Sequence, residues 1–298
     1  MTCNDKTKRT CALIGNPVAH SASFSMHNAL YESAFLPWNY QAILCEDNAA
    51  ARNCIELVRD GEIFGMNITY PFKKLALKLA DNFSEAAQIA GGANVLLLED
   101  GRLIAHNTDG AGFFRALLDK LHRNNLQGTA LCICGTGPTA RVIAYECAYG
   151  GADAIRFLSR DEARAKNCAQ QLKTATCHLE KCAFSYGTYE CSDIILCEAD
   201  LVINATPVGL NDPEEMLKIN IDALTNEQLV IDLMYASHTT ALLHAAKRAG
   251  AATMNGLEML VQQAALSAEL WFEAAGIDVS VNRDIMRNAA KKALSKRG

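Results

Sequence analysis

The sequence predicts an α/β protein with two domains, and three observations favour this class. The chain has 298 residues, which is more than one typical domain, and half of them are apolar, which is enough for two hydrophobic cores. Short apolar runs also alternate along the chain with segments of helical periodicity. Alternation of this kind is typical of sheets whose strands are connected by helices.

The composition argues against several functional classes. The net charge of −5 is not that of a nucleic-acid-binding surface. The chain has no apolar run of about 18 residues, so we expect no membrane span, and the polar N-terminus Met1–Lys6 predicts no signal peptide. The twelve cysteines are scattered without metal-ligand spacing. We therefore expect no metal site, and free thiols in a reducing cytoplasm.

In the first half, two polar segments each stand between an expected strand and an expected helix. The first is Asn67–Lys73, in which Pro71 fits the first turn of the helix. The second is Asn107–Gly110. A lysine alone is most often a solvated surface residue, but Lys73 and Asp109 both lie at strand ends and can meet. Such a pair is suited to proton transfer at a carbonyl group.

Two serines lie in the polar loop that follows the first expected strand. Ser21 and Ser23 either cap the next helix or bind a polar ligand, and the sequence leaves both interpretations open. A hairpin turn is expected at Glu99–Gly101. The expected helices of this half are 24–35, 48–59 and 82–90, and the expected strands are 9–14, 38–43, 64–69, 93–98 and 102–106.

The second half opens with an apolar strand at 129–134, a glycine-containing turn, and a helix to about Tyr149. The glycines of this turn, Gly135 and Gly137, let the backbone approach a pyrophosphate, and the helix N-terminus faces the phosphate charge. The third glycine of the usual fingerprint is missing, and Pro138 stiffens the turn. Strand, turn and helix together predict a Rossmann-type dinucleotide-binding domain.

The end of the next expected strand, 153–158, is where this type of domain meets the adenosine ribose. Arg160 and Arg164 favour the 2′-phosphate of NADP, whereas Asp161 favours the ribose hydroxyls of NAD. A solvated helix start is the alternative for both arginines. We therefore expect NADP(H) as the cofactor, with NAD(H) as the alternative.

Two helices after Gly256 have no strand of their own to cover, so we expect them to return to the first domain. The predicted domains are a substrate-binding domain at 1–108 plus 256–298 and a dinucleotide-binding domain at 109–255. The other elements expected in the second half are strands at 199–204, 229–234 and 251–254 and helices at 111–122, 240–249, 257–274 and 280–294.

Five motifs, taken in order, resemble those of the shikimate dehydrogenase family, and the resemblance extends over nearly the whole chain. Each motif is short, but the combination is specific. The motifs are Gly15-Asn16-Pro17-Val18-Ala19-His20-Ser21-Ala22-Ser23, Asn67-Ile68-Thr69-Tyr70-Pro71-Phe72-Lys73, Asn107-Thr108-Asp109-Gly110, Asn204-Ala205-Thr206-Pro207 and Gly256-Leu257-Glu258-Met259-Leu260-Val261-Gln262-Gln263-Ala264.

The resemblance implies an NADPH-dependent, reversible reduction of 3-dehydroshikimate to shikimate, a step of aromatic amino-acid biosynthesis. It implies Lys73 and Asp109 as the catalytic pair. The residues implied to bind substrate are Ser21, Ser23, Thr69, Asn94, Tyr235 and Gln263. The residues implied to bind the cofactor are Gly135, Thr136, Gly137, Pro138, Thr139, Ser159, Arg160, Asp161, Arg164, Ala205, Thr206, Leu233 and Gly256.

Several residues depart from the family pattern, and those at the expected cofactor site bear on the choice of cofactor. Pro138 replaces a glycine of the phosphate loop, and Ser159 and Asp161 replace Asn and Thr of the adenosine motif. One alternative is therefore an NAD-dependent quinate/shikimate dehydrogenase. Another is a catalytically weak paralogue that binds nucleotide and a small acid as a regulator, although the retained Lys73 and Asp109 argue against it. The expected partner is a small-molecule substrate rather than nucleic acid or membrane, and a homodimer is compatible with the sequence.

Overall fold

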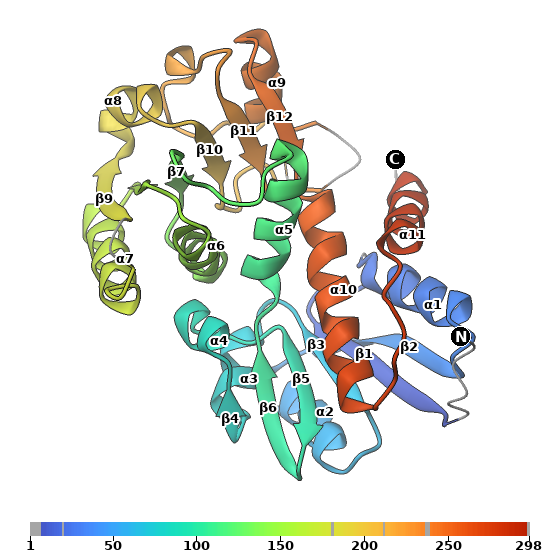
Figure 1. The fold of residues 1–298 in the computed structure, drawn as a ribbon. Helices are drawn as coiled ribbons and strands as arrows, with labels where there is room; N and C mark the ends of the chain where they lie inside the picture. The colour runs from blue at the N-terminus through green and yellow to red at the C-terminus, as the bar shows by residue number, and fades with distance from the viewer. Residues whose placement is uncertain (1–6, 20, 180–181, 211, 236–238, 297–298) are drawn as a thin grey trace. The chain divides into compact units, whose positions relative to one another are not determined.

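The computed structural model describes residues 7–19, 21–179, 182–210, 212–235 and 239–296 (Figure 1). The polar N-terminal residues Met1–Lys6 lie outside these ranges. The chain divides into two compact units: Met1–Gly112 with Leu260–Gly298 form the first, and Phe113–Met259 form the second. Each unit contains one six-stranded sheet, so the predicted α/β class with two domains is confirmed.

The sheet of the first unit is mixed, in the strand order β2-β1-β3-β5-β6-β4. Strands β2 and β3 run parallel to β1, whereas β5 runs antiparallel to both β3 and β6. The elements of this unit are β1 (Arg9–Gly15), α1 (Ser23–Ser33), β2 (Trp38–Leu44), α2 (Asn48–Arg59), β3 (Gly65–Ile68), α3 (Lys73–Leu79), β4 (Asn82–Phe83), α4 (Glu85–Ala90), β5 (Val95–Glu99), β6 (Arg102–His106), the start of α5 (Asp109–Leu121), most of α10 (Leu257–Ala274), and α11 (Arg283–Ser295).

The strand directions bring the two predicted polar segments to one sheet edge. Asn67 on β3 is in register with Val95 on β5, and Val95 is in register with His106 on β6. Because β5 runs opposite to its two neighbours, the end of β3, the start of β5 and the end of β6 all lie at this edge. The residues just beyond those ends therefore gather in one place.

Two sequence predictions for this unit are wrong in detail. The sequence predicts a helix at 82–90, but Asn82 and Phe83 form a short strand that pairs with β6, and the helix begins at Glu85 after Ser84, whose side chain accepts a hydrogen bond from the Ala87 amide. The sequence also places Pro71 in the first turn of a helix, but α3 begins only at Lys73, after a cis peptide bond between Tyr70 and Pro71. Lys73 thus stands at the start of α3.

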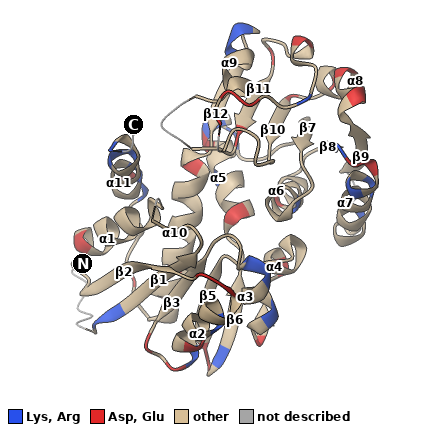
Figure 2. Ribbon diagram, turned by 180° about the vertical axis from the view of Figure 1, so that it is seen from behind, with Lys and Arg blue, Asp and Glu red and all other residues tan. Residues whose placement is uncertain are grey.

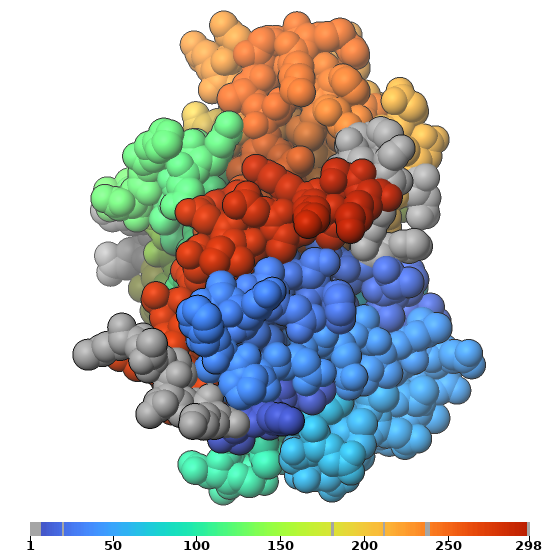
Figure 3. Space-filling model, turned by 90° about the vertical axis from the view of Figure 1, so that its right-hand side faces the viewer, coloured from blue at the N-terminus to red at the C-terminus, as the bar shows by residue number. Residues whose placement is uncertain are grey.

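Helices cover the first sheet through apolar stripes. In α2 the buried residues Ala51, Ile55 and Val58 recur at helical spacing, and Asp47 caps the helix by accepting a hydrogen bond from the Ala50 amide. The C-terminal helix α11 packs along α1, and Figure 3 shows the red atoms of the C-terminal segment directly against the blue atoms of the N-terminal one. The end of the chain therefore completes the unit that its beginning starts.

An aromatic cluster lies between α1, β2 and α10. The His27 ring stacks on Tyr40 with centroids 4.3 Å apart, and the Trp271 ring lies 5.3 Å from His27. Gly65 on β3 is required here, because a Cβ at that position would stand 2.3 Å from the indole nitrogen of Trp271. Burial lowers the pKa of His27 to about 3, so the imidazole is neutral inside the folded protein.

The second unit contains a fully parallel sheet in the order β12-β11-β10-β7-β8-β9. Numbered from β7, this is the usual strand order of the dinucleotide-binding fold, in which the order reverses between β7 and β10. A helix, a strand and a short helix between 162 and 197 were not predicted. The elements are β7 (Ala130–Cys134), α6 (Pro138–Tyr149), β8 (Ala154–Ser159), α7 (Glu162–Ala175), β9 (Ala183–Thr188), α8 (Ser192–Cys197), β10 (Leu201–Asn204), β11 (Leu229–Asp232), α9 (Ala241–Arg248) and β12 (Ala252–Asn255), with single 3-10 turns at Tyr189–Cys191 and Ile221–Ala223.

Among the described helices, none is both long and apolar enough to cross a membrane.

The neutral state of buried His27 predicts a pH-dependent stability. In the unfolded chain the imidazole binds a proton below pH about 6.5, whereas in the folded protein it binds one only near pH 3. The unfolded state therefore holds more protons between these values, and stability falls as the pH is lowered from about 6.5 towards 3. We expect wild type to lose about 2 kcal/mol more than His27→Phe between pH 7 and pH 5.

Urea unfolding of both proteins at the two pH values measures this difference. The exposed His244 provides the control, because its replacement by asparagine should leave the wild-type pH dependence in place. Equal losses in wild type and His27→Phe would contradict the prediction.

Candidate functional site

Lys73 and Asp109 form an ion pair at the polar edge of the first sheet. Lys73 Nζ lies 2.6 Å from Asp109 Oδ2, and the two side chains are 27% and 11% exposed. Helix α3 carries the three lysines Lys73, Lys74 and Lys78, which are blue in Figure 2. Only Lys73 among them makes this contact. An ammonium group held by a partly buried carboxylate can donate a proton to a nearby oxygen and stabilise negative charge there.

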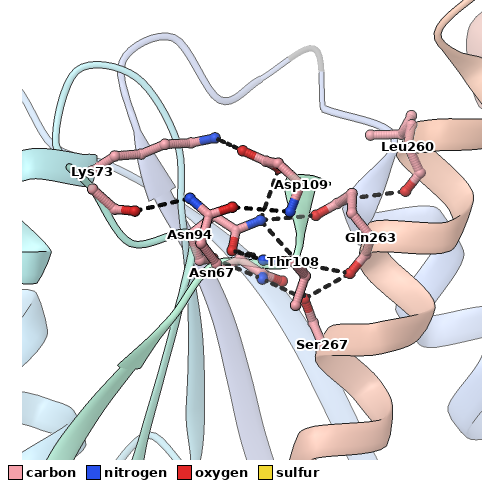
Figure 4. A network of polar contacts seen from close by, with 10 residues as sticks. Asn67, Lys73, Asn94, Thr108, Asp109, Leu260, Gln263 and Ser267 are labelled. Atoms are coloured by element: carbon pink, nitrogen blue, oxygen red, sulfur yellow. Dashed lines mark hydrogen bonds and ion pairs between the residues drawn. The ribbon is translucent and has the colours of Figure 1, made fainter. Parts of the chain in front are cut away.

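Asn94 holds the carboxylate from the other side (Figure 4). Its Nδ2 donates to Asp109 Oδ1 at 2.9 Å and to Thr108 Oγ1 at 3.0 Å, while its Oδ1 accepts from the Thr108 amide at 2.8 Å. The side chain lies just before β5 and is 3% exposed. Since both ends of the amide are engaged, its orientation is fixed, and each carboxylate oxygen of Asp109 has a donor.

Helix α10 closes the site through Gln263. Its Oε1 lies 3.4 Å from Asn94 Nδ2, its Nε2 donates to the Leu260 carbonyl, and its own carbonyl accepts from Thr108 Oγ1 at 3.0 Å. Gly112 on α5 permits this approach, because a Cβ there would stand 2.7 Å from the Gln263 amide nitrogen. The structure thus joins Lys73, Asp109, Asn94 and Gln263 into one hydrogen-bonded group.

A deeper set of polar residues was missed by sequence reasoning. Four buried residues belong to this set: Tyr40, Asn67, Thr108 and Ser267. Asn67 is hydrogen-bonded to Tyr40 and to Ser267, and Thr108 is hydrogen-bonded to Gln263. Asn67 and Thr108 stood inside the polar segments, which is a signal that could have found them. Ser267 lies four residues, one helical turn, beyond Gln263, whereas Tyr40 occupies an ordinary inward position of the alternating strand β2 and carries no such signal.

The loop with the two serines runs beside the loop that follows β3. The Asn16 amide donates to the Tyr70 carbonyl at 2.9 Å, and the Thr69 methyl group packs where a Cβ of Gly15 would stand. Ser21 Oγ accepts from the Ser23 amide at 3.2 Å, so it makes a local turn, while the position before α1 is Ala22 and gives no side-chain cap. Thr69 and Ser21 are partly exposed, and Ser23 is buried.

In the second unit, the glycine turn follows β7 at the reversal point of the sheet. Gly135 has a φ of +112°, and a Cβ there would lie 3.0 Å from the Ala205 carbonyl oxygen, which follows β10. The Ala205 amide in turn donates to the Cys134 carbonyl at 2.9 Å. Turn and loop are therefore packed against each other at the ends of adjacent parallel strands.

This turn fits a pyrophosphate. A Cβ at Gly137 would meet nothing within 4 Å, so the backbone surface is open there. Gly137 also gives α6 no side-chain cap, which leaves the first amides of the helix directed at any ligand of the turn. Pro138 at the first helical position removes one such donor, and Thr136 and Thr139 are partly exposed beside it.

The expected adenosine segment forms the start of α7. Asp161 caps this helix by accepting from the Arg164 amide at 3.1 Å, and its Oδ2 lies 3.2 Å from Arg164 Nε. Ser159 Oγ accepts from the Asp161 amide. Arg160 and Arg164 are exposed. The carboxylate that favours ribose hydroxyls is thus already engaged by the protein.

The loops after β10 and β11 are held by a buried carboxylate. Asp232 is 1% exposed, and its oxygens accept from Asn204 Nδ2, from the Met234 amide and from Thr240 Oγ1 at 3.1, 3.1 and 2.7 Å. Burial raises the pKa of Asp232, and these donors oppose the rise. Asn204 Oδ1 then accepts from the amide and hydroxyl of Thr206.

The remaining expected residues lie next to these loops. Leu233 and Gly256 are in direct contact, since a Cβ at Gly256 would stand 2.0 Å from the Leu233 carbonyl oxygen. Tyr235 is 37% exposed and belongs to the second unit, unlike the other residues expected to bind substrate. In the described part of the chain, no group of three or more His, Cys, Asp or Glu side chains is arranged to hold a metal ion.

Comparison with known proteins gives a consistent family. A family model for the shikimate dehydrogenase substrate binding domain matches residues 13–96. The shikimate dehydrogenase (NADP(+)) of Desulforamulus reducens is 34% identical over 295 residues, which are 98% of this chain and 98% of that protein.

Solved structures show the same similarity. Shikimate 5-dehydrogenase from Thermus thermophilus, in complex with NADP(H) and shikimate, is 31% identical with a TM-score of 0.82, covering 96% of this chain and 100% of that one. Quinate dehydrogenase from Corynebacterium glutamicum, in complex with NAD, is 25% identical with a TM-score of 0.83, again covering 96% and 100%.

The contacts of Asn94 predict a strong effect of Asn94→Asp. The substitution keeps the shape of the side chain but replaces the Nδ2 donor, which lies 2.9 Å from Asp109 Oδ1, by an oxygen. Two carboxylates then face each other in a buried site, and we expect stability at pH 7 to fall by about 3 kcal/mol.

Calorimetric unfolding at pH 7 tests this expectation. Asn39→Asp is the matched control, because Asn39 is exposed and its Oδ1 only accepts a hydrogen bond, from Thr10. If the two variants lost equal stability, the donor role of Asn94 would be disproved.

Proposed function

Because the chain belongs to the shikimate dehydrogenase family, we propose that it catalyses the reversible, NADPH-dependent reduction of 3-dehydroshikimate to shikimate. It is accordingly an NAD(P)-dependent oxidoreductase that acts on a CH–OH group. The single observation that carries the proposal is the ion pair between Lys73 Nζ and Asp109 Oδ2, which lie 2.6 Å apart. The other carboxylate oxygen of Asp109 accepts a hydrogen bond from Asn94.

The proposed roles of the pair follow from the chemistry of ketone reduction. The bound dihydronicotinamide supplies the hydride. The carbonyl oxygen gains negative charge and must be protonated, and we assign this proton to the Lys73 ammonium. Asp109 holds the ammonium in place and stabilises its charge, and in the reverse direction Lys73 and Asp109 together accept the proton of the substrate hydroxyl. Asn94 fixes Asp109 for both directions.

The side chains around the pair support a polyhydroxylated acid as the substrate. Ser21 and Ser23 offer hydroxyl groups for a carboxylate, and Thr69 lies on the loop beside them. Asn94 and Gln263 offer amides for ring hydroxyls. Tyr235 is assigned to the same substrate through the family resemblance. Such groups form hydrogen bonds with hydroxyls and carboxylates. An apolar ligand would leave these side chains of the protein without hydrogen-bond partners.

For the cofactor we propose NADP(H). The pyrophosphate would be held at the turn of Gly135, Thr136, Gly137, Pro138 and Thr139, and the nicotinamide beside Ala205, Thr206, Leu233 and Gly256. Asp161 is engaged as the cap of α7 and as the partner of Arg164. Arg160 is therefore the exposed group best suited to a 2′-phosphate. Because the Asp161 carboxylate already has these partners, we infer that NADP is preferred over NAD, the cofactor in the structure of the similar quinate dehydrogenase.

We further propose a cytoplasmic enzyme whose partner is its small-molecule substrate. Every cysteine in the described part of the chain is a free thiol, which is in keeping with a reducing compartment. We include a homodimer in this proposal, because the sequence is compatible with one.

Lys73→Ala tests the catalytic role. We expect kcat to fall by about a thousandfold or more, with a small change in KM, because the ammonium acts on charge that develops in the transition state. Lys74→Ala is the matched control, since Lys74 is the next residue of α3 and is exposed. A large loss confined to KM would remove Lys73 from the catalytic step.

A binding experiment tests the cofactor. We expect NADPH to bind at least about tenfold more tightly than NADH, as measured by quenching of protein fluorescence, and Arg160→Ala to remove most of this preference. Asp161→Asn keeps the helix cap while removing the charge, and it should leave NADPH binding in place.

Turnover of shikimate and quinate with each nucleotide, measured in parallel, separates the alternatives. Rapid use of NAD, especially with quinate, would indicate the quinate/shikimate enzyme instead. Tight nucleotide binding with no turnover of either acid would indicate a regulatory paralogue.

A further inference from the structure

Beneath the Lys73–Asp109 pair lie three buried polar side chains that no reaction step uses. Tyr40, Asn67 and Ser267 are 1%, 7% and 0% exposed, and they come from β2, β3 and α10. We call these three residues the buried polar layer. None of them contacts Lys73 or Asp109 through a hydrogen bond in the described structure, so any influence on the pair passes through other residues.

Asn67 is the centre of this layer. Its Oδ1 accepts from the Tyr40 hydroxyl at 2.8 Å, and its Nδ2 donates to Ser267 Oγ at 3.0 Å and to the Asn94 carbonyl at 3.0 Å. Ser267 Oγ donates in turn to the Gln263 carbonyl at 2.9 Å. Tyr40 and Ser267 therefore hold the two ends of one amide and determine which way it faces.

Tyr40 is itself rigidly placed. Its ring stacks on His27 with an interplanar angle of 9°, and Trp271 packs at 6.1 Å on another side. Burial raises the pKa of Tyr40 well above its usual range, so the hydroxyl keeps its proton and stays a donor. The Tyr40 hydroxyl is thus held in one position, from which it donates to Asn67 Oδ1.

The layer reaches the reactive pair through Asn94. Its carbonyl accepts from Asn67 Nδ2 and from the Ile68 amide, while its side chain donates to Asp109 Oδ1. The preceding Ala93 amide donates to the Lys73 carbonyl at 2.9 Å. A small shift of the backbone at Asn94 therefore displaces the contacts of both members of the pair. Since proton transfer depends on sub-ångström placement, such a shift lowers the rate.

From these contacts we propose that Tyr40 and Ser267 are positioning residues, which act through Asn67 and Asn94 to hold the Lys73–Asp109 pair in its reactive geometry. The inference rests on the proposed function, because it assigns these residues to the same reaction.

Two conservative variants test the inference. Tyr40→Phe and Ser267→Ala each remove one hydroxyl without adding atoms. Tyr40→Phe removes the donor to Asn67 Oδ1, and Ser267→Ala removes one of the two acceptors of Asn67 Nδ2, which keeps the Asn94 carbonyl. We expect each to lower kcat for shikimate about tenfold with KM within about twofold of wild type. Because we propose that both act through Asn67, the fold-loss of kcat in the double variant should be little larger than that of the more impaired single variant. If the two acted independently, it would be the product of the two single losses.

Tyr31→Phe is the matched control. Tyr31 belongs to the same aromatic cluster, is 1% exposed, and has a hydroxyl outside the network. It removes an equally buried hydroxyl, so we expect wild-type kcat. Losses of kcat in Tyr40→Phe and Ser267→Ala that only equal that of Tyr31→Phe would overturn the inference and leave a merely structural role.

A second readout separates this inference from the proposed function. The amides of Thr108 and Asp109 donate to Asn94 Oδ1 at 2.8 Å and Asn107 Oδ1 at 3.0 Å. Hydrogen–deuterium exchange at these amides should be faster in Tyr40→Phe and Ser267→Ala than in Tyr31→Phe. If wild type turned over neither acid, the proposed function would fail, and exchange would decide the positioning role by itself. Unchanged exchange in both variants would overturn it.

Discussion

The polar site of the first unit depends on the hydrogen bonds of Asn94. This residue stands just before the one strand, β5, that runs against its two neighbours, and so it enters the sheet edge where β3 and β6 end. From there its amide reaches Asp109, and its carbonyl meets Asn67. A strand in the other direction would place this residue at the far edge. Topology, rather than any local motif, therefore assembles the polar site.

The second unit solves a different problem with a simpler sheet. All of its strands are parallel, so their carboxyl ends meet at one edge without any inserted strand. The close approach of Gly135 to Ala205 occupies the reversal point of the strand order. Asp232 then fixes the neighbouring loops with a buried carboxylate whose three donors compensate its burial.

Much of this arrangement could be predicted from the sequence, because polar residues at the ends of apolar strands are visible as motifs. The α/β class is confirmed, and the structure brings Lys73, Asp109, Asn94 and Gln263 together. Tyr40 could not be found this way, because it occupies an inward position of β2 and its partner Asn67 is distant in the sequence. Ser267 lies one turn beyond Gln263, but its bond to Asn67 spans distant parts of the chain and has no local signal. The error at 82–90 has a similar cause: the two-residue strand β4 owes its existence to pairing with β6, not to its own propensity.

The bond between Asn67 and Ser267 spans 200 positions of the chain. The second unit is continuous in sequence, whereas the first is interrupted by it and resumes only at residue 260. During synthesis on the ribosome, the second unit can therefore fold as soon as its own residues have emerged. The first unit must wait for α10, which brings Ser267 to Asn67 and Trp271 to Gly65. Until that helix appears, the N-terminal sheet lacks the side chains that pair with Asn67 and pack on Gly65.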